Sequence, residues 1–249
     1  MLPKDYISPS QIRQYLQCPF CYSMKYIHGV WQPKNQYLVR GKAVHAAIDH
    51  NYNQKIKTHE DLPVDEVKEM AAFRFDEEKE DAEFEDDEGK VLDSTVTLSE
   101  LYHLEVAPMV QPIQTEQKVE VAFEGLDYTL MGIIDLLDSE GVIHDTKTAK
   151  RTPNESVIND NLQLMAYGLM HETLHGTLPD IQLDYVVATK TPKVIQFRRS
   201  VTQEDTTYFL KLMETVVKGI ENEIFFPADN CWSCGTPKGY YYDFRKEYV

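Results

Sequence analysis

Two short segments place acidic and basic side chains where a metal-dependent hydrolase would need them. Asp135 stands in the mostly apolar run Gly132-Ile-Ile-Asp-Leu-Leu, where an isolated carboxylate is costly to bury. Asp145 and Lys147 are two residues apart, so on a strand their side chains would point to the same face. If the two segments pair as a hairpin, the two carboxylates and the lysine meet at one point.

This set of residue types suits the hydrolysis of a phosphodiester bond. Two carboxylates and a main-chain carbonyl, such as that of Thr146, form a hard oxygen site for Mg²⁺ or Mn²⁺. Such an ion polarises a phosphoryl oxygen and lowers the pKa of a bound water. Lys147 could orient or deprotonate that water, and His45 could complete the coordination of the metal. The alternative is a structural ion pair between Asp145 and Lys147, beside an incidental Asp135.

The elements that would position these residues can be predicted from hydrophobic periodicity. Alternating or short apolar runs predict strands at residues 117–123, 128–137, 142–146, 181–189 and 194–201. Helical spacing predicts helices at residues 38–52, 159–174 and 203–224, and a further helix that begins near Pro9. Ser8 and Thr202 are the expected N-caps of the first and last of these helices. We therefore expect an α/β fold with a mixed central β-sheet flanked by helices.

The length of 249 residues suits one domain with a full core. We expect a single domain over residues 1–249, with a helical, acidic insertion at about residues 55–115 and a cysteine-containing C-terminal tail. No apolar run reaches the roughly 18 residues of a transmembrane helix, and the N-terminus has no apolar signal segment. The chain is therefore expected to be cytoplasmic, with no membrane partner.

Five segments, taken in order, resemble the motifs of the PD-(D/E)XK nuclease superfamily, in its RecB-like branch. That branch includes the nuclease domains of RecB and AddB and the CRISPR adaptation exonucleases. One such motif is weak, but five in the same order are specific. The similarity spans nearly the whole chain except roughly residues 55–115. The segments are Ser8-Pro-Ser-Gln-Ile with Cys18-Pro19, Gly41-Lys-Ala-Val-His45, Gly132-Ile-Ile-Asp135, Asp145-Thr-Lys147-Thr148 and Gln163-Leu-Met-Ala-Tyr167.

The resemblance implies a restriction-endonuclease-like core and a role for each matched residue. His45, Asp135, Asp145 and the carbonyl of Thr146 would bind the metal, and Lys147 would serve the attacking water. The last motif, which follows on a helix, would support the lysine or touch DNA through Gln163 and Tyr167. These two residues are four apart and so share one helix face. Glu120, on the strand before the hairpin, lies where some relatives place an acid, but it suits a solvated strand position equally well.

The four cysteines form two Cys-x-x-Cys pairs near the two ends of the chain, which in a cytosolic protein indicates a metal site before disulfides. Several RecB-like relatives hold an iron–sulfur cluster with one early and three late cysteines. Tyr240 stands where the last of these is expected, so Cys21 would supply the missing thiolate. The set could hold a [4Fe-4S] cluster or, alternatively, Zn²⁺, and it would join the two chain ends. Its members are Cys18, Cys21, Cys231 and Cys234.

The net charge of −16 is unusual for a protein whose partner is DNA, because phosphate contacts usually call for a basic surface. The charge is uneven, since residues 76–88 carry ten acids and one base. Such a run is usually a solvated helix face or loop, although it could also keep DNA off one face. The aromatic and basic tail around Tyr240 could stack on single-stranded bases or simply pack.

Taken together, these features predict a Mg²⁺- or Mn²⁺-dependent DNA exonuclease of phage or bacterial recombination or repair. Two alternatives remain open, a nuclease of CRISPR spacer acquisition and a non-catalytic DNA-binding scaffold with the same fold. A recombination or single-strand annealing protein is a possible partner, and a homo-oligomer is compatible with the sequence.

Overall fold

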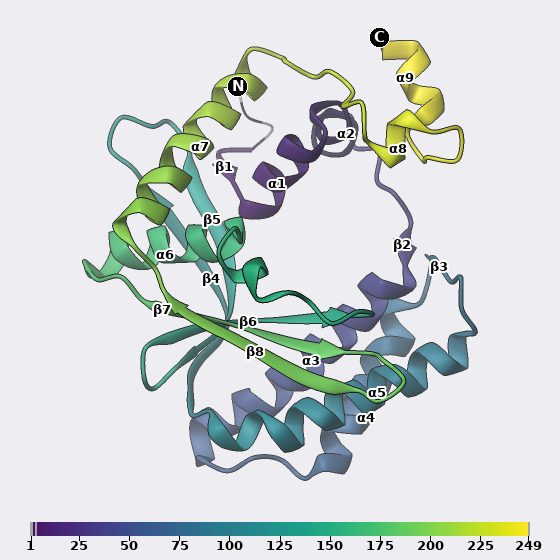
Figure 1. Ribbon diagram of the computed structural model, residues 1–249, viewed down its shortest axis with the longest axis vertical. Coiled ribbons are helices and arrows are strands. Elements are labelled where there is room, and N and C mark those ends of the chain that lie inside the picture. The colour runs from purple at the N-terminus through teal and green to yellow at the C-terminus, as the bar shows by residue number, and fades with distance from the viewer. Residues whose placement is uncertain (1, 3, 249) are drawn as a thin grey trace.

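A six-stranded mixed sheet forms the centre of the computed structural model, which describes residues 2 and 4–248 (Figure 1). Its strands are β1 (Tyr6–Ile7), β4 (Pro112–Ala122), β5 (Thr129–Asp138), β6 (Val142–Ala149), β7 (Asp180–Val187) and β8 (Lys193–Ser200). Strand β5 pairs antiparallel with β4 along its whole length, while β6 pairs parallel with β7 and β7 antiparallel with β8. The sheet is therefore mixed, as expected from the sequence.

Strands β5 and β6 form a fork rather than a continuous ladder. They pair only at Leu136 and Leu137, next to the hairpin turn that contains Gly141. At its other end, the same edge of β5 pairs with the short parallel strand β1, at Thr129 and Leu130. The middle of β5 therefore faces β6 across a gap in the ladder, and Asp135 is the first residue beyond the last paired position.

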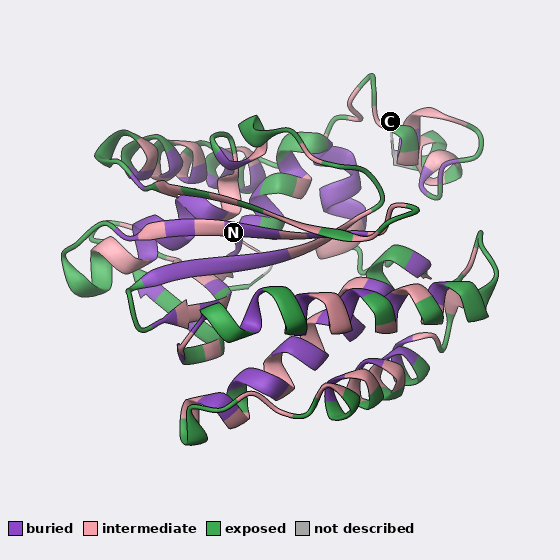
Figure 2. Cartoon of the chain, turned by 60° about the horizontal axis from the view of Figure 1, so that its bottom comes forward, coloured by how far each residue is buried: buried purple, intermediate pink, exposed green. Residues whose placement is uncertain are grey.

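Helices cover both faces of the sheet. They are α1 (Pro9–Gln17), α2 (Pro19–Tyr22), α3 (Gln36–Thr58), α4 (Val64–Glu78), α5 (Glu88–Glu105), α6 (Leu162–His175), α7 (Gln203–Glu221), α8 (Trp232–Gly235) and α9 (Tyr242–Tyr248), with the short π-helix η1 (Ser23–Ile27) and 3-10 helices η2 (Ala107–Met109) and η3 (Glu155–Ile158). The main core joins α1, α6 and α7 to one face of the sheet. A second core joins α3 and α5 to the other face, through Leu136 and Val186. Figure 2 shows buried residues along the strands and on the inner sides of the helices, with exposed residues on the outer sides.

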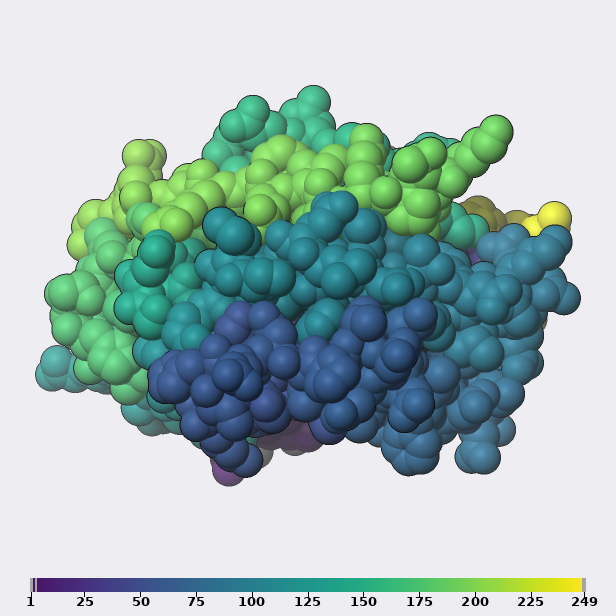
Figure 3. Space-filling view, turned by 90° about the horizontal axis from the view of Figure 1, so that it is seen from below, coloured from purple at the N-terminus to yellow at the C-terminus, as the bar shows by residue number. Residues whose placement is uncertain are grey.

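Three helices, α3, α4 and α5, form the lower lobe of the molecule. Helices α4 and α5 pack on α3 through small apolar clusters that include Phe75 and Val67. The two-stranded sheet of β2 (Lys34–Asn35) and β3 (Ala82–Glu83) ties the loop between α4 and α5 to the start of α3. Seen from below, this lobe makes up much of the surface, with the segment before α5 at one end (Figure 3). Most of residues 55–105 are thus helical.

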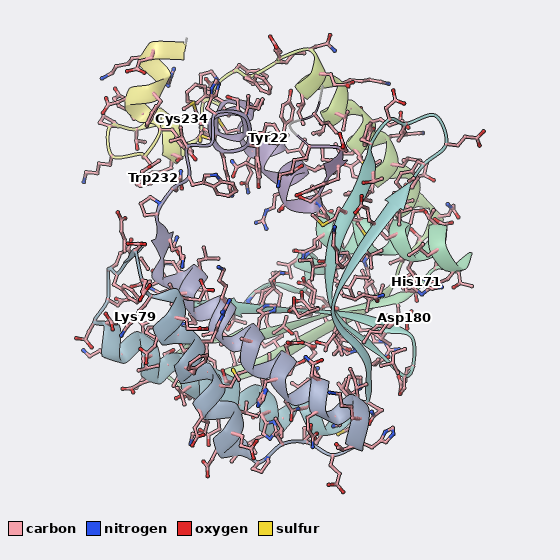
Figure 4. All side chains as sticks on the ribbon, turned by 180° about the vertical axis from the view of Figure 1, so that it is seen from behind. Tyr22, Lys79, His171, Asp180, Trp232 and Cys234 are labelled. Carbon is pink, nitrogen blue, oxygen red and sulfur yellow. The ribbon has the colours of Figure 1, made fainter. Side chains whose placement is uncertain are left out.

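The two ends of the chain meet away from this lobe. Helix α2 and the C-terminal α8 share a small apolar cluster that contains Phe20, Met24 and Tyr241. Figure 4 shows Cys234 and Trp232 on the C-terminal segment, near the helix that carries Tyr22. Tyr241 is buried and its hydroxyl donates to the carbonyl of Val30, so this part of the aromatic tail is packed. Among the described residues, no helix is long and apolar enough to cross a membrane.

Local signals in the sequence located most elements to within a few residues. Ser8 caps α1 by accepting from the backbone N–H of Gln11, and Thr202 caps α7 in a reciprocal capping box with Asp205. Helix α3 is longer at both ends than the apolar stripe predicted, because Asn35 caps its start and the helix runs on to Thr58. Strand β4 begins at Pro112, earlier than expected, because it follows β5 to the end of that strand.

Candidate active site

Asp135 lies at the fork between β5 and β6, and its carboxylate bridges the gap. Its Oδ2 accepts a hydrogen bond from the backbone N–H of Thr146, at 3.0 Å. This bond occupies a place where two fully paired strands would have a main-chain bond. The side chain is 15% exposed, so the carboxylate is largely removed from water yet open toward one side. At the fork, the buried carboxylate of Asp135 is thus held by a hydrogen bond and remains open on one side.

Asp145 and Lys147 lie on β6 and meet as the alternation of a strand predicts. The ammonium of Lys147 donates to Oδ1 of Asp145 at 2.7 Å. Asp145 is fully buried, and its Oδ2, although 2.7 Å from the same nitrogen, accepts no hydrogen bond of good geometry from the described residues. A buried carboxylate oxygen without a hydrogen bond is costly, so this site is electrostatically incomplete.

A relay of hydrogen bonds fixes the position of Lys147. Its ammonium also donates to Oε1 of Gln163 at 3.2 Å, and the amide of Gln163 donates to the Tyr167 hydroxyl at 2.7 Å. Tyr167 in turn donates to the carbonyl of Ile133. Gly132 makes room for this arrangement, because a Cβ there would lie 3.0 Å from the Tyr167 ring. Each donor in the relay therefore has one acceptor, which holds the lysine in one orientation.

His45, on α3, reaches the same point from the opposite side of the fork. Its Nε2 lies 2.8 Å from the carbonyl of Thr146, which can only accept, so this nitrogen carries a hydrogen. Its Nδ1 faces two carboxylates, Asp135 Oδ2 at 3.5 Å and Glu116 Oε1 at 3.7 Å. One ligand atom from each of His45, Glu116 and Asp135 lies within 4.8 Å of the others, a spacing that could hold a metal ion.

The charges at this point shift the pKa values of its members. Burial, reinforced by the charge of Asp145, raises the pKa of Asp135 to about 7. Burial alone would lower the pKa of Lys147, but the charges of Asp145 and Asp135 outweigh it and raise that pKa. Lys147 is thus a charged hydrogen-bond donor here, and a second positive charge near Asp135 and Asp145 would relieve their mutual repulsion.

A cavity of about 980 Å³ opens onto these residues. It lies between the N-terminus of α1, at Ser8 and Ser10, and helices α3 and α4. Lys42 and Arg74 also line it, and both form ion pairs with Glu78, which is 6% exposed. The groove therefore has acids at its base and, along its wall, two cations that are already paired with acids, Lys42 with Glu78 and Arg74 with Glu77 and Glu78.

The acidic segment at residues 76–88 is partly tied to this region. Asp86 accepts from Gln36 at 2.7 Å and pairs with Lys150 at 3.1 Å. Tyr37, which lines the cavity, donates to Glu85. Lys79 lies between two other acids of the segment, Asp76 and Glu88. Several of these carboxylates thus have local partners. The segment runs from the end of α4 through β3 to the start of α5, so it is not one continuous helix face.

The structure brings together seven residues that the sequence singled out for chemistry, namely His45, Asp135, Asp145, Thr146, Lys147, Gln163 and Tyr167. It also adds one that the sequence did not indicate, Glu116. Glu120, which the sequence suggested instead, lies four residues further along β4. There it accepts from Thr129 and pairs with Lys118, both exposed contacts. No alternation distinguishes Glu116 from its polar neighbours, but its backbone φ of +46° does.

The four cysteines also converge. Cys18 Sγ lies 3.6 Å from Cys234 Sγ, and Cys21 Sγ lies 3.4 Å from Cys231 Sγ. All four sulfurs lie within 4.8 Å of one another. A hydrogen bond from Cys21 lowers the pKa of the Cys18 thiol to about 4, and the backbone N–H of Ala228 also donates to that sulfur. The cluster is therefore suited to hold a metal ion, as its two Cys-x-x-Cys pairs predicted.

Comparison with known protein families agrees with this geometry. Residues 6–237 match the sequence model of the PD-(D/E)XK nuclease superfamily. The matched range contains every residue of the fork and all four cysteines. A search of curated proteins gives no match.

A solved structure shares the fold at low sequence identity. A crystal structure from Eubacterium rectale, named "Putative exonuclease", is 13% identical, with a TM-score of 0.61 over 92% of this chain and 87% of the other. A second structure, named SSO0001, is 11% identical, with a TM-score of 0.34 over 84% of each chain. The first likeness supports the shared fold, and the second is too distant to support an argument.

Proposed function

We propose, because this chain belongs to the PD-(D/E)XK nuclease superfamily, that it is a Mg²⁺- or Mn²⁺-dependent exonuclease that hydrolyses DNA. The observation that carries the proposal is the convergence of Asp135, Asp145 and Lys147 at one fork, with an unbonded buried carboxylate oxygen between them. The name of the E. rectale structure is consistent with exonuclease action. Phage or bacterial recombination or repair is the proposed setting.

The donor set at the fork fits a divalent cation. It consists of carboxylate oxygens, one imidazole nitrogen and the carbonyl of Thr146, which are ligands that Mg²⁺ and Mn²⁺ accept. We assign His45, Asp135, Asp145 and Thr146 to this role. When bound, the cation supplies positive charge to a phosphoryl oxygen and to the attacking water.

The remaining residues would position the reacting groups. Lys147, charged and held by Gln163, can donate a hydrogen bond to the attacking water or to an oxygen that gains charge on phosphorus. Tyr167 fixes Gln163 and thus acts through it. The cations of the groove wall, Lys42 and Arg74, are placed to contact phosphates of the bound strand.

The activity can be tested with linear and covalently closed circular DNA in Mn²⁺. We expect the protein to degrade the linear DNA and spare the closed circle. Asp135→Ala and Lys147→Ala should each lower the rate by roughly 10²–10³-fold, as loss of a transition-state contact does. Asp180→Ala, an exposed acid paired with Arg198 far from the fork, is the matched control and should retain full activity.

Other outcomes separate the alternatives. Cleavage of the closed circle would retain the nuclease and refute the exonuclease. Activity that survives Asp135→Ala and Lys147→Ala would refute the assignment of these residues. A protein that binds Mn²⁺ through Asp135 but never cuts DNA would be the scaffold, whereas trimming that requires partner proteins would favour the spacer-acquisition nuclease. Sedimentation with and without DNA would show whether a homo-oligomer forms.

We infer that the four cysteines hold a single metal ion, with Zn²⁺ as the best fit. A tetrahedral ion with Zn–S bonds of about 2.3 Å places its sulfurs about 3.8 Å apart. The observed pairs, at 3.4 and 3.6 Å, are close to this value. A four-iron cluster attaches each thiolate to a different iron and so requires a wider arrangement. The geometry therefore favours zinc over the cluster that the family resemblance suggested.

Metal analysis of anaerobically purified protein tests this assignment. We expect about one zinc per chain, no iron and no visible absorption, with the zinc lost in a Cys18→Ser variant. Because Cys18 and Cys234 join the two chain ends, chelation should lower thermal stability. A brown protein with several irons per chain would refute the zinc assignment and restore the cluster.

A further inference from the structure

Glu116 occupies a strained position on β4, in the part of that strand that pairs with β5 beyond the register shift between Pro112 and Gln114. Its φ of +46° is in the left-handed region, which is unfavourable for a residue other than glycine. Thr115 pairs with Leu136 and Gln117 pairs with Ile134, so Glu116 stands directly opposite Asp135. The strain is thus confined to the one residue of β4 that faces the acid of the fork.

Two acids directly opposite each other on paired strands repel and destabilise a sheet. The group between them is the imidazole of His45, while the charge of Lys147 acts on Asp135 from further along the fork. The Nε2 of His45 is committed to donating to the Thr146 carbonyl. Burial lowers the pKa of His45, but its contact with Glu116 and the charge of Asp135 outweigh burial and raise that pKa. A cation that replaces the proton on Nδ1 would meet its lone pair and both carboxylates. Three electron-rich atoms therefore converge on one point, an arrangement that a cation would stabilise.

This group is distinct from the pair formed by Asp145 and Lys147. The three atoms within 4.8 Å of one another come from His45, Glu116 and Asp135, and Asp145 is not among them. Both carboxylate oxygens of Asp145 instead lie 2.7 Å from the Lys147 ammonium, and the fully buried Oδ2 accepts no hydrogen bond of good geometry. Asp135 lies between the two groups. A carboxylate shared by two cations is the usual bridge in sites where a pair of metals clamps a phosphodiester.

We propose that Glu116 is a metal ligand, and that with His45 and Asp135 it holds a second divalent cation. His45 then belongs to this second cation, and the first is held by Asp135, Asp145 and the carbonyl of Thr146. This inference rests on the proposed function, since it enlarges the same site. Thr115, the neighbour of Glu116 on β4, helps to fix the position of the strand. Thr115 Oγ1 lies 2.8 Å from Asp49 Oδ1 and 3.1 Å from the Asp135 carbonyl, so these hydrogen bonds hold the distorted strand against α3.

Counting bound Mn²⁺ by calorimetry and electron paramagnetic resonance tests the proposal without any activity assay. We expect the wild-type chain to bind two Mn²⁺ with a spin-coupled signal, and Glu116→Gln to bind one, uncoupled. The matched control is Glu120→Gln on the same strand, which should bind two. The cysteines should not add to the count, because Mn²⁺ prefers oxygen ligands to thiolates.

A second variant guards against loss of folding. Glu116→Gly removes the carboxylate and tolerates the positive φ. Its metal-free form should therefore unfold at a temperature no lower than that of the wild type, while it binds one Mn²⁺. Two bound ions in either Glu116 variant, or a single ion in the wild type, would overturn the proposal.

Failure of this inference is distinguishable from failure of the proposed function. A wild type that binds one Mn²⁺ and still degrades linear DNA would refute the role of Glu116 and leave the nuclease intact. A wild type that binds no Mn²⁺ at the fork would refute both. Two coupled ions without DNA cleavage would uphold Glu116 and refute the nuclease.

Discussion

The two faces of strand β6 each carry buried charged side chains, and the two groups differ in how far their hydrogen bonding is complete. On one face, His144 lies between Asp138 Oδ2 at 3.0 Å and Asp184 Oδ2 at 3.1 Å. Both partners can only accept when ionised, so both ring nitrogens carry hydrogens. On the other face lie Asp145 and Lys147, with Asp135 close by.

The hydrogen bonding of the group around His144 is complete without a further ligand. Asp184 Oδ1 accepts from two glutamine amides, and Asp138 Oδ1 accepts from the backbone N–H groups of Glu140 and Val142. Burial lowers the pKa of His144, but its bonds to the two aspartates outweigh burial and raise that pKa to about 9. This group needs no further ligand, and it joins β5, β6 and β7 beneath helices α3 and α5.

The hydrogen bonding of the group at the fork is incomplete. This group has an unbonded oxygen on Asp145, a carboxyl at Asp135 whose pKa is raised by burial to about 7, and a strained Glu116. Both groups are buried and charged, so burial alone does not distinguish a structural group from a functional one. What distinguishes the fork is that its oxygen without a hydrogen bond lies among several carboxylates, where a cation or substrate would add the missing contacts.

The largest expected effect comes from breaking the complete group. Asp184→Ala leaves the charged His144 with one partner and should lower the free energy of unfolding by about 3–5 kcal/mol. Urea unfolding measures this loss. Asp180→Ala, on the same strand but exposed and paired with Arg198, should cost less than about 1 kcal/mol. Equal losses, or loss of Mn²⁺ binding in Asp184→Ala, would remove the distinction between the two groups.

The pH dependence of stability gives a smaller, signed effect. Because the folded-state pKa of His144 is raised to about 9 from 6.5, its contribution is fully present below pH 6.5 and is lost as pH rises through 9. The loss should be on the order of 3 kcal/mol. Urea unfolding at pH 6.5 and pH 10 should show this decline in the wild type.

The control is His144→Gln, which cannot titrate and should show a shallower decline over the same interval. Added Mn²⁺ should leave the difference between the two proteins unchanged, because the group is complete without a cation. An equal slope in both proteins would place the titration elsewhere.

The smallest expected effect concerns the relay behind Lys147. Gln163→Ala removes the acceptor at 3.2 Å from the lysine and should lower kcat roughly 10-fold, with Mn²⁺ affinity unchanged. Tyr167→Phe keeps the ring beside Gly132 and removes only the hydroxyl, so its effect should be smaller. A fall in Mn²⁺ affinity with unchanged kcat would instead make Gln163 a support for the metal ligands.

The sequence was informative where a site depends on local alternation. Asp145 and Lys147 share a face because they are two apart on a strand, and Gln163 and Tyr167 share one because they are four apart on a helix. The cysteine pairs were visible for the same reason. The caps at Ser8 and Thr202 also depend only on neighbouring residues.

Features that depend on pairing between distant strands could not be predicted. Glu116 is one polar residue among several in β4, and only its position opposite Asp135 indicates a functional role. The role of His144 could not be predicted either, since its partner Asp184 is 40 residues away. The choice between zinc and an iron–sulfur cluster depends on sulfur–sulfur distances, which spacing along the chain does not determine.

One measurement tests the central claim most directly, namely an anomalous-difference map from a crystal of the wild-type protein grown in Mn²⁺. We expect a peak within about 2.0–2.6 Å of carboxylate oxygens of Asp135 and Asp145, and no peak beside His144. Such a map would show that the incomplete group is completed by a cation and the complete group is not. A fork without a peak, with the Mn²⁺ bound elsewhere, would contradict the account.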